Sequence, residues 1–566
     1  MLKSEKLSKI TGHITFVIIF IFFSTLHAKN LDKYSSAENI SDYFAGMLSL
    51  NESKYNDSLK YFKKLNGLEE SHQNYSANFL YSSINAGNFN EAYNFSKTLE
   101  RDNQDIFESN LILGIYYLRN SNFDLSKKYF LKAKNKKNLT ILDNYLLETL
   151  NIWTSLQNKE LERAIFEIDK LDNRFNSLKK IQVVFVNCFL NNNKTELLFE
   201  NLISDNETDY SRYYYFYAKY LAGKGEIDKS KKILISSLKK FPRNILLNQY
   251  KIDLENSRES FDFDCKNVRD VIAELMYIAA NALSSQSIYS LSNFYINLSK
   301  YLNSKFHVYD ILMAENFFKA GDIDEAKKIY ERLIKFGSAF EWHSNKQISR
   351  IFINNNEKDK ALKLLKKSYR ELSYKGLYDT FDLAEFLKNS EEFEDAIIYY
   401  SNILDKINES HPLYPEATDG RGVSYERIGI WEKAEIDLLA SLKSSPDQAY
   451  VINYLAYTWI EKGIKIEESL KMLEKANRLK TNDPYIIDSL GWALFKLKRF
   501  KESKNYLQTA VKLMPADPIV NDHYGDVLWK NGNKIQARYY WKYVLNLDET
   551  EKSLKEVIEK KLIKGL

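Results

Sequence analysis

The stretch DSLGWALFKLKRFKESKNYLQTAVKLMPADP, residues 488–518, is followed by NDHYGDVLWKNGNKIQARYYWKYVLNLDE, residues 521–549, which repeats its plan with different letters. Gly491 in the first stretch corresponds to Gly525 in the second, 34 residues later. A fixed offset of this size indicates an internal repeat, and such self-similarity decides the fold before any single element does.

The same spacing continues upstream, at Ala456 and Gly422. Each of these small residues is followed, about one helix later, by a second small residue, and proline ends two of the units. One match would mean little, but four in register indicate a repeat array. The residues that mark the array along the chain are Gly114, Ala326, Ala361, Ala396, Gly422, Ala434, Pro446, Leu490, Gly491, Ala510, Pro515, Gly525 and Ala537.

A repeat of this length predicts two antiparallel helices per unit. A glycine in the first helix lets the neighbouring helix approach closely, and a small residue near the start of the second helix marks the crossing. Proline stops the second helix because it lacks an amide proton and clashes with the preceding turn. One pair cannot bury both of its faces, so the units must stack into an all-α solenoid.

This pattern resembles the tetratricopeptide repeat, whose signature the opening stretch carries in Leu490, Gly491, Ser503, Ala510 and Pro515. The resemblance is specific over 415–550 and weaker, but continuous, before it. It implies a right-handed superhelix of antiparallel helix pairs. It also implies that the first helices line a concave groove, which holds a segment of a protein or peptide partner.

Breaks in the period divide the chain. We expect a signal peptide or N-terminal anchor at 1–28, a solenoid of degenerate repeats at 29–249, an irregular connection at 250–270, a second solenoid at 271–549 and a capping helix at 550–566. The cap would shield the last apolar face from water.

The N-terminus has the layout of a secretory signal: three lysines, the apolar run ITFVIIFIFF, then STLHA with a cut expected after Ala28. The run is too short to span a bilayer comfortably, although an uncleaved membrane tether is the alternative. We therefore expect an exported protein of the bacterial periplasm. Lipid attachment is not expected at the end of the apolar run, because no cysteine stands there.

Charge and cysteines exclude some partners. Lys and Arg number 81 against 76 Asp and Glu, a net charge of +5, which gives no basic field to recruit nucleic acid. Cys188 and Cys265 are the two cysteines. They are either two small buried residues or a disulfide, with the first favoured, and no further ligands nearby suggest a metal site.

No catalytic or cofactor motif is present, neither a glycine-rich phosphate loop nor a zinc or nucleophile signature. Repeats cover most of 39–550, which leaves no stretch of about 100 residues for a separate catalytic domain. The sequence therefore predicts a non-enzymatic protein without a cofactor.

The resemblance places one set of side chains in the groove. The position two residues before the Leu-Gly pair is Asp or Asn in four consecutive units, and aromatic or acidic residues follow within one turn or two. Such acceptors beside aromatic rings would grip peptide amides and an apolar side chain. The predicted groove residues are Asp419, Asn453, Tyr457, Asp488, Trp492, Asp522, Asp526 and Trp529.

The competing interpretation is structural: a polar residue repeated by duplication, and tryptophans packed between helices. In either case the acidic ladder would repel a partner's C-terminal carboxylate, so capture of that group is not expected. A further aromatic stretch, DYSRYYYFYAKY near 210–220, predicts a buried helix, with an aromatic wall for a glycan or peptide as the alternative.

The run from 451 to 533 is similar to tetratricopeptide proteins of the bacterial cell envelope. Some of these bring a processing protease to its cell-wall hydrolase substrates. The resemblance implies a scaffold or adaptor for an envelope protein, such as a processing protease or a peptidoglycan enzyme. The alternative is a component of an envelope secretion or polysaccharide-export machine.

Overall fold

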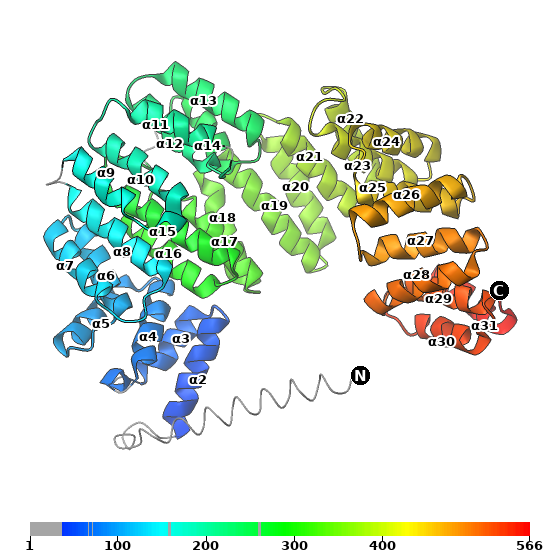
Figure 1. The fold of residues 1–566 in the computed structure, drawn as a ribbon, viewed down its shortest axis with the longest axis horizontal. Helices are drawn as coiled ribbons and strands as arrows, with labels where there is room; N and C mark the ends of the chain where they lie inside the picture. Colours follow the sequence, from blue (N-terminus) through cyan, green and yellow to red (C-terminus); the bar gives the residue numbers. More distant parts are fainter. Residues whose placement is uncertain (1–36, 66, 71, 157–159, 206, 259–261) are drawn as a thin grey trace. The chain divides into compact units, whose positions relative to one another are not determined.

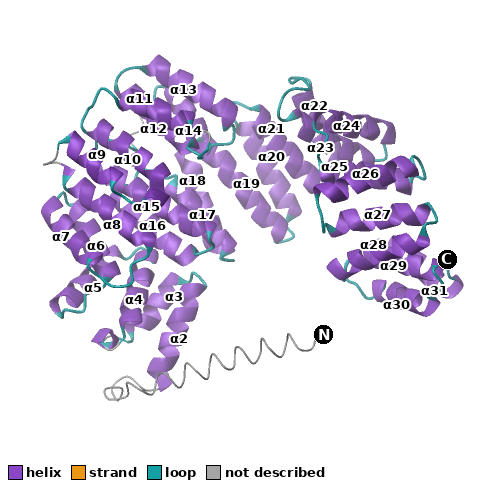
Figure 2. Ribbon diagram, in the orientation of Figure 1, coloured by secondary structure: helices purple, strands orange, loops and turns teal. Residues whose placement is uncertain are grey.

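The computed structural model describes residues 37–566, with the exception of 66, 71, 157–159, 206 and 259–261. The described residues form α-helices and short 3₁₀ turns, and they contain no strand (Figure 2). The predicted all-α helical-repeat solenoid is therefore confirmed. The predicted signal peptide or anchor at 1–28 lies outside the described residues. No helix of the described part is both long enough and apolar enough to span a membrane.

The chain divides into two compact units, residues 1–368 and 369–566. The helices of the first unit (Figure 1) are α2 (Ala37–Asn51), α3 (Tyr55–Lys63), α4 (Gln73–Asn85), α5 (Phe89–Arg101), α6 (Phe107–Arg119), α7 (Phe123–Lys134), α8 (Ile141–Thr154), α9 (Leu161–Asp169), α10 (Asn176–Phe189), α11 (Thr195–Ser204), α12 (Ser211–Gly223), α13 (Ile227–Lys240), α14 (Ile245–Glu255), α15 (Val268–Ser285), α16 (Tyr289–Leu302), α17 (Tyr309–Lys319), α18 (Ile323–Leu333), α19 (Ser338–Asn354) and α20 (Lys358–Glu371). In the described part of this unit, 3₁₀ turns lie at η2 (Leu68–Glu70), η4 (Asn173–Phe175) and η5 (Ile334–Phe336).

The second unit begins in the last turn of α20. Its helices are α21 (Leu377–Asn389), α22 (Phe393–Leu404), α23 (Tyr414–Arg427), α24 (Trp431–Ser444), α25 (Ala449–Glu461), α26 (Ile466–Leu479), α27 (Pro484–Lys496), α28 (Phe500–Leu513), α29 (Pro518–Lys530), α30 (Lys534–Val544) and α31 (Lys552–Lys564). Pro446 and Pro515 follow the ends of α24 and α28 by two residues.

Small residues set the distance between the two helices of a hairpin. A Cβ atom on Gly491 would lie 2.7 Å from the Leu507 side chain, and one on Gly525 would lie 2.4 Å from the Trp541 ring. The serine of the second helix completes the crossing, because the Ser503 hydroxyl donates to the Gly491 carbonyl at 2.7 Å. The alanines of the signature, such as Ala537, are fully buried at the same crossing.

The hairpin α15–α16 fills the inner side of the first unit. Helix α16 packs against α4 and α6, and α15 packs against α8 (Figure 1). The Asn85 amide donates to the Ser290 carbonyl at 2.9 Å, and the Asn293 amide donates to the Tyr55 hydroxyl at 2.9 Å. The face that α4, α6 and α8 present to this hairpin is thus buried within the unit.

A buried ion pair ties α12 to α15. Arg212 donates from Nε and Nη2 to the two carboxylate oxygens of Glu274, at 2.6 and 2.8 Å. The Glu274 side chain is fully buried, and the rings of Tyr277 and Phe306 lie 4.2 and 4.9 Å from the guanidinium carbon. The pair is buried where the dielectric constant is low. Removing either partner would therefore leave the other charge unpaired and would destabilise the contact between α12 and α15.

The boundary between the two units lies between Ser368 and Tyr369, and not in the connection expected at 250–270. The described residues of that connection are irregular between α14 and α15, but they belong inside the first unit. Asp262 pairs with Lys219 at 2.8 Å, and the α15–α16 hairpin packs against α4. Contacts on both sides of the connection therefore hold it within one body.

The two cysteines form a disulfide. Cys188 of α10 and Cys265, just before α15, are joined, with their Cα atoms 6.0 Å apart. The favoured sequence interpretation, two unpaired buried residues, was wrong on the pairing, although both side chains are buried. The 77 residues between them gave no sign of their proximity, because the irregular segment before α15 returns the chain to α10.

Candidate functional site

The predicted groove residues lie on four first helices of the second unit: Asp419 on α23, Asn453 and Tyr457 on α25, Asp488 and Trp492 on α27, and Asp522, Asp526 and Trp529 on α29. Half of them are not open to a partner. Asp488, Trp492, Asp522 and Asp526 are all less than 8% exposed. The structure shows what they contact instead.

Asp488 and Trp492 bind the next repeat. The His523 ring on α29 contacts Asp488 through Nδ1 at 2.9 Å and stacks on the Trp492 ring at 3.9 Å. Burial lowers the pKa of His523, but the charges of Asp488, Asp522 and Asp526 outweigh it and raise the pKa overall. This site therefore links α27 to α29.

Asp522 and Asp526 bind the last helix. The Lys561 ammonium on α31 donates to both carboxylates at 2.6–2.9 Å, and the Trp541 indole donates to Asp526 at 3.0 Å. Burial and the charge of Asp522 raise the pKa of Asp526 to about 6, against the opposing charge of Lys561. The buried Ile558 of α31 packs on the same repeat, so α31 covers the end of the array.

The other predicted residues are half-buried. Burial raises the pKa of Asp419 to about 6, and Trp529 packs against Trp541 with Arg538 over its ring. Asn453 and Tyr457 retain partial exposure on α25. These acidic side chains thus bond mainly to neighbouring helices of the array. Sequence reasoning missed the two residues that bind them, His523 and Lys561.

The aromatic stretch near 210–220 forms the buried helix α12. Tyr213, Tyr215, Phe216 and Tyr217 are all at most 5% exposed and pack inside the first unit. The alternative of an exposed aromatic wall does not hold for these four side chains.

An apolar groove opens between α9, α10 and α11 in the first unit, with a volume of about 850 Å³. We call it the α9–α11 groove. Each helix contributes residues spaced three and four apart, so one face of each helix lines it. These are Ile165, Phe166 and Ile168 of α9, Val183 and Val184 of α10, and Leu198 and Leu202 of α11, with Glu162, Asp169, Asn176, Lys179, Lys180 and Asn201 among them.

The walls of the α9–α11 groove are accessible. Phe166 is 59% exposed, which is unusual for a phenylalanine in a folded unit. Lys179 is held by the Asp169 carbonyl at 2.8 Å, and Lys180 is paired with Asp205 at 2.6 Å. The basic groups of the floor are therefore already engaged, and the Phe166 ring stays open to solvent although the Lys170 ammonium lies 4.0 Å from its centre.

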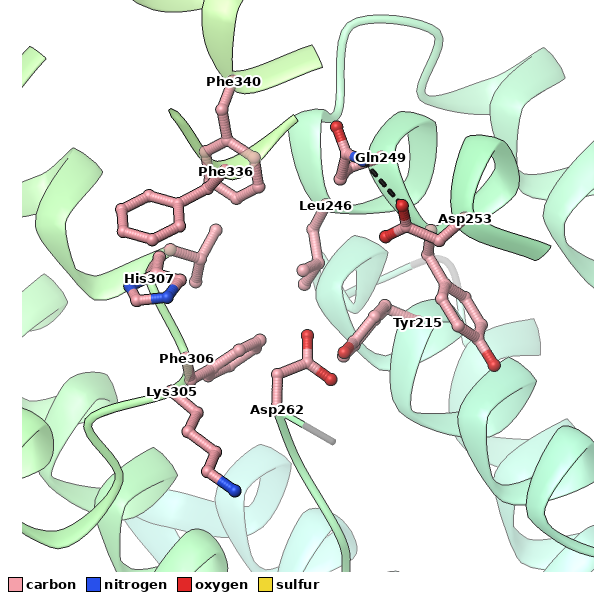
Figure 3. Close-up of a pocket in the computed structure, with 12 residues that line it drawn as sticks. Tyr215, Leu246, Gln249, Asp253, Asp262, Lys305, Phe306, His307, Phe336 and Phe340 are labelled. Atoms are coloured by element: carbon pink, nitrogen blue, oxygen red, sulfur yellow. Dashed lines mark hydrogen bonds between the residues drawn. The ribbon is translucent and has the colours of Figure 1, made fainter. Parts of the chain in front are cut away.

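A second cavity, of about 320 Å³, lies beside α14 in the same unit (Figure 3). We call it the α14 cavity. One face of α14, with Leu246, Gln249, Tyr250 and Asp253, forms one wall. The opposite wall comes from the segment before α17, from η5 and from the start of α19. Aromatic rings and carboxylates share this cavity.

The described residues contain no group of three or more His, Cys, Asp and Glu side chains that could hold a metal ion. The described residues form stacked helical hairpins. Residues 319–550 match the family model described as Tetratricopeptide repeat. The matched part of the chain, residues 319–550, therefore consists of tetratricopeptide repeats.

The relatives cover only parts of the chain. A TPR repeat-containing protein of Pseudomonas aeruginosa is 28% identical over 126 residues, which are 22% of this chain and 20% of the relative. The chain thus spans about a fifth of that relative's length.

Two solved structures are similar over about a third of the chain. A tetratricopeptide repeat protein from Parabacteroides merdae is 16% identical, with a TM-score of 0.33 over 39% of this chain and 85% of its own. YrrB, described as a TPR protein with an unusual peptide-binding site, is 16% identical, with a TM-score of 0.28 over 34% of this chain and 97% of its own.

Proposed function

We propose that this chain is an exported scaffold that binds an envelope protein by holding one of its amphipathic helices in the α9–α11 groove. Tetratricopeptide repeat proteins act as protein–protein interaction scaffolds. The observation that carries the site is the groove itself, where α9, α10 and α11 each contribute an apolar side chain that is at least partly exposed, Phe166, Val183 and Leu198.

The groove suits a helix. Its floor is α10 and its walls are α9 and α11, each two to three turns long. An amphipathic helix lays an apolar stripe into such a channel through residues spaced three, four and seven apart. The volume of about 850 Å³ lies within the range of sites that bury most of their ligand.

The charges indicate which side of the partner faces α9. Glu162 and Asp169 are exposed on that wall, two turns apart, and no ion pair to either carboxylate is seen in the described part of the chain. The lysines of the floor are engaged elsewhere. A partner helix with Lys or Arg beside its apolar stripe would complement this wall.

The inner side of the first unit is a less suitable site, because the α15–α16 hairpin already occupies it. A partner would have to displace that hairpin and its buried hydrogen bonds. The outer groove requires no such displacement.

Export is supported by the N-terminal residue pattern, which precedes the described residues, and by the disulfide between Cys188 and Cys265. Disulfides persist in oxidising compartments such as the periplasm. Fractionation of cells and mass spectrometry of the isolated protein test this part: we expect a periplasmic protein that begins near Lys29. A reduced protein in the cytoplasm would contradict it.

The groove is tested with a photo-crosslinking residue in place of Phe166, incorporated in the full chain in its own cells. We expect one envelope polypeptide to be crosslinked, and peptide mapping should place the crosslink on a helical segment with an apolar stripe. The matched control is the same crosslinker in place of Ile235, a 53% exposed apolar residue of α13 that lies outside the groove.

The variant Phe166→Asp should then weaken binding of the identified partner by at least about 30-fold, since central aromatic contacts contribute about 2 kcal/mol or more. Its helicity and melting should match those of Ile235→Asp, because both residues are exposed. Equal capture at positions 166 and 235, or unchanged affinity of Phe166→Asp, would remove the groove assignment. Recovery of a processing protease or a peptidoglycan enzyme would support the adaptor role.

A further inference from the structure

The α14 cavity carries a second inference, which does not depend on the α9–α11 groove. Its walls are aromatic on both sides: Tyr215 and Tyr250 on one, and Phe306, Phe336 and Phe340 on the other (Figure 3). The Tyr215 and Phe306 rings stack nearly parallel, with centroids 5.8 Å apart, which leaves no room for a group between them. A flat ligand group would instead lie against the faces of the aromatic rings that line the cavity.

Two carboxylates point at the same cavity. Asp253 accepts one hydrogen bond, at 2.9 Å, from the Gln249 amide, and the Gln249 carbonyl is held in turn by the Ala339 backbone N–H at 3.1 Å. Asp262 accepts one bond from Lys219 at 2.8 Å. In the described part of the chain, no hydrogen bond reaches the second oxygen of either carboxylate. Both groups are positioned, and each retains an acceptor.

Among the described residues that line the cavity, the basic side chains are Lys305 and His307, and no hydrogen bond from either to Asp253 or Asp262 is seen there, although the charges of Arg258 and Lys219 act on Asp253. Lys305 lies on the rim and points away from Asp253 in Figure 3. His307 stacks on Phe336 at 3.3 Å, and burial lowers its pKa, which keeps the ring neutral. Burial, followed by the nearby charge of Asp262, raises the pKa of Asp253. An incoming cation would relieve this unfavourable charge.

Lys219 shows that a cation is accepted at the edge of this site. Its ammonium pairs with Asp262 and lies 5.4 Å from the centre of the Tyr250 ring. A positive group between a carboxylate and an aromatic face is stabilised by both. Asp253, Tyr215 and Phe306 line the same cavity and offer the same two kinds of group.

We propose that the α14 cavity binds the guanidinium group of an arginine side chain. A guanidinium is planar, stacks on aromatic faces and presents several N–H donors in a fixed fork, so it can bond to both Asp253 and Asp262. An ammonium is compact and strongly hydrated, and it would use the flat walls less well. The aliphatic part of the arginine would lie against Leu246 and Phe340.

The test is isothermal titration calorimetry of the full exported protein with N-acetyl-arginine amide. N-acetyl-citrulline amide, which is neutral and nearly the same shape, is the matched probe. We expect saturable binding of the arginine compound, at least tenfold tighter than that of the citrulline compound. Equal binding of the two probes, or no saturable binding of either up to 10 mM (about 2.7 kcal/mol of binding free energy), would overturn the proposal.

The matched variants lie on one helix. Asp253→Asn keeps the shape of the side chain and should weaken the arginine probe at least tenfold. Glu255→Gln removes a 56% exposed carboxylate two residues away on α14 and should leave the affinity unchanged. If both variants bind like the parent, Asp253 is not a ligand. Circular dichroism verifies that Asp253→Asn folds, and Phe336→Ala offers a second variant that should also weaken binding.

The guanidinium could come from a free metabolite or from a protein. Agmatine and an arginine-containing peptide separate these sources: equal affinity for both assigns a small-molecule site, and tighter binding of the peptide assigns a docking site. Phe166→Asp should not change either affinity, so a failure of the α9–α11 groove and a failure of the α14 cavity can be told apart.

Discussion

In the first unit, residues more than 200 positions apart are joined by hydrogen bonds, from the Asn85 amide to the Ser290 carbonyl and from the Asn293 amide to the Tyr55 hydroxyl. In the second unit, the bonds between repeats join residues about one repeat apart, as His523 does with Asp488 and Lys561 with Asp522. A simple array gains its stability from each repeat and its immediate neighbours. The first unit has an additional source of stability, because its α15–α16 hairpin packs against α4, α6 and α8.

This difference teaches that the same repeat can build two kinds of body. The first unit should open as a whole, since its distant contacts must break together. The second should fray from its ends, one repeat at a time. The two candidate sites lie in the first unit, which holds their walls at fixed distances.

The largest expected effect concerns matched ion pairs. Arg212–Glu274 in the first unit and Arg421–Asp437 in the second have the same two-bond geometry, but the Glu274 carboxylate is fully buried and the Asp437 side chain is 7% exposed. Arg212→Met should destabilise the first unit by about 3–5 kcal/mol, because it leaves a buried carboxylate without a partner. Arg421→Met should cost the second unit less, about 1–3 kcal/mol.

Urea unfolding followed by hydrogen-exchange mass spectrometry assigns each loss to a unit. The double variant Arg212→Met/Glu274→Leu should recover most of the stability, since neither charge is then buried alone. Equal losses for the two single variants would contradict the contrast between the units.

The next effect is pH dependence at the end of the second unit. Between its ordinary value of 3.8 and about 6, Asp526 keeps a proton in the folded protein that the unfolded chain has lost. Its contribution to stability is therefore full below that range and is lost as the pH rises through it. His523, whose pKa is raised above 6.5, acts in the same direction at higher pH.

Helices α29–α31 should thus become less stable as the pH rises from 4 to 8, by about 3 kcal/mol. Hydrogen exchange of these helices measures it. Asp526→Asn should flatten the change between pH 4 and 6, and His523→Gln should flatten it above 6.5. The charged groups that face these two are Asp488, Asp522 and Lys561. A profile that neither variant alters would place the titration elsewhere.

The repeat and its helix pairs were predictable from the sequence, because a glycine such as Gly491 and its partner serine recur wherever two helices cross. The residues that bind the acidic side chains of the first helices, His523 and Lys561, were not predictable. An Asp such as Asp488 gives the same pattern whether it faces solvent or the helix of the next repeat. Only the packing of α29 and α31 decides that His523 and Lys561 reach it.

The long-range features of the first unit had no sequence signal either. Asn293 and Ser290 carry no periodic pattern that would place them beside α4 and Tyr55. The apolar stripe of α9 looks like an ordinary core face in the sequence, and the structure shows that Phe166 remains exposed. The α14 cavity combines residues from segments more than 120 positions apart, from Tyr215 to Phe340, so no local motif could reveal it.

The smallest expected effect comes from one added methyl group in each unit. In Gly114→Ala the new Cβ would lie 2.3 Å from the Phe130 ring, and in Gly525→Ala 2.4 Å from Trp541. The clash costs about 1–3 kcal/mol, and the better helix propensity of alanine offsets up to about 1 kcal/mol. Gly223→Ala, where nothing lies within 4 Å, is the control and should be neutral or slightly stabilising.

The number of helices in which each substitution speeds hydrogen exchange distinguishes the two units better than the loss of stability does. Gly525→Ala should speed hydrogen exchange in α27–α31 and leave α21–α24 unchanged, because repeats transmit strain only to their neighbours. Gly114→Ala on α6 should speed exchange as far away as α15 and α16, since α16 packs on that helix. If Gly114→Ala acts only on α5–α8, the hairpin does not couple the first unit, and both units would be simple arrays.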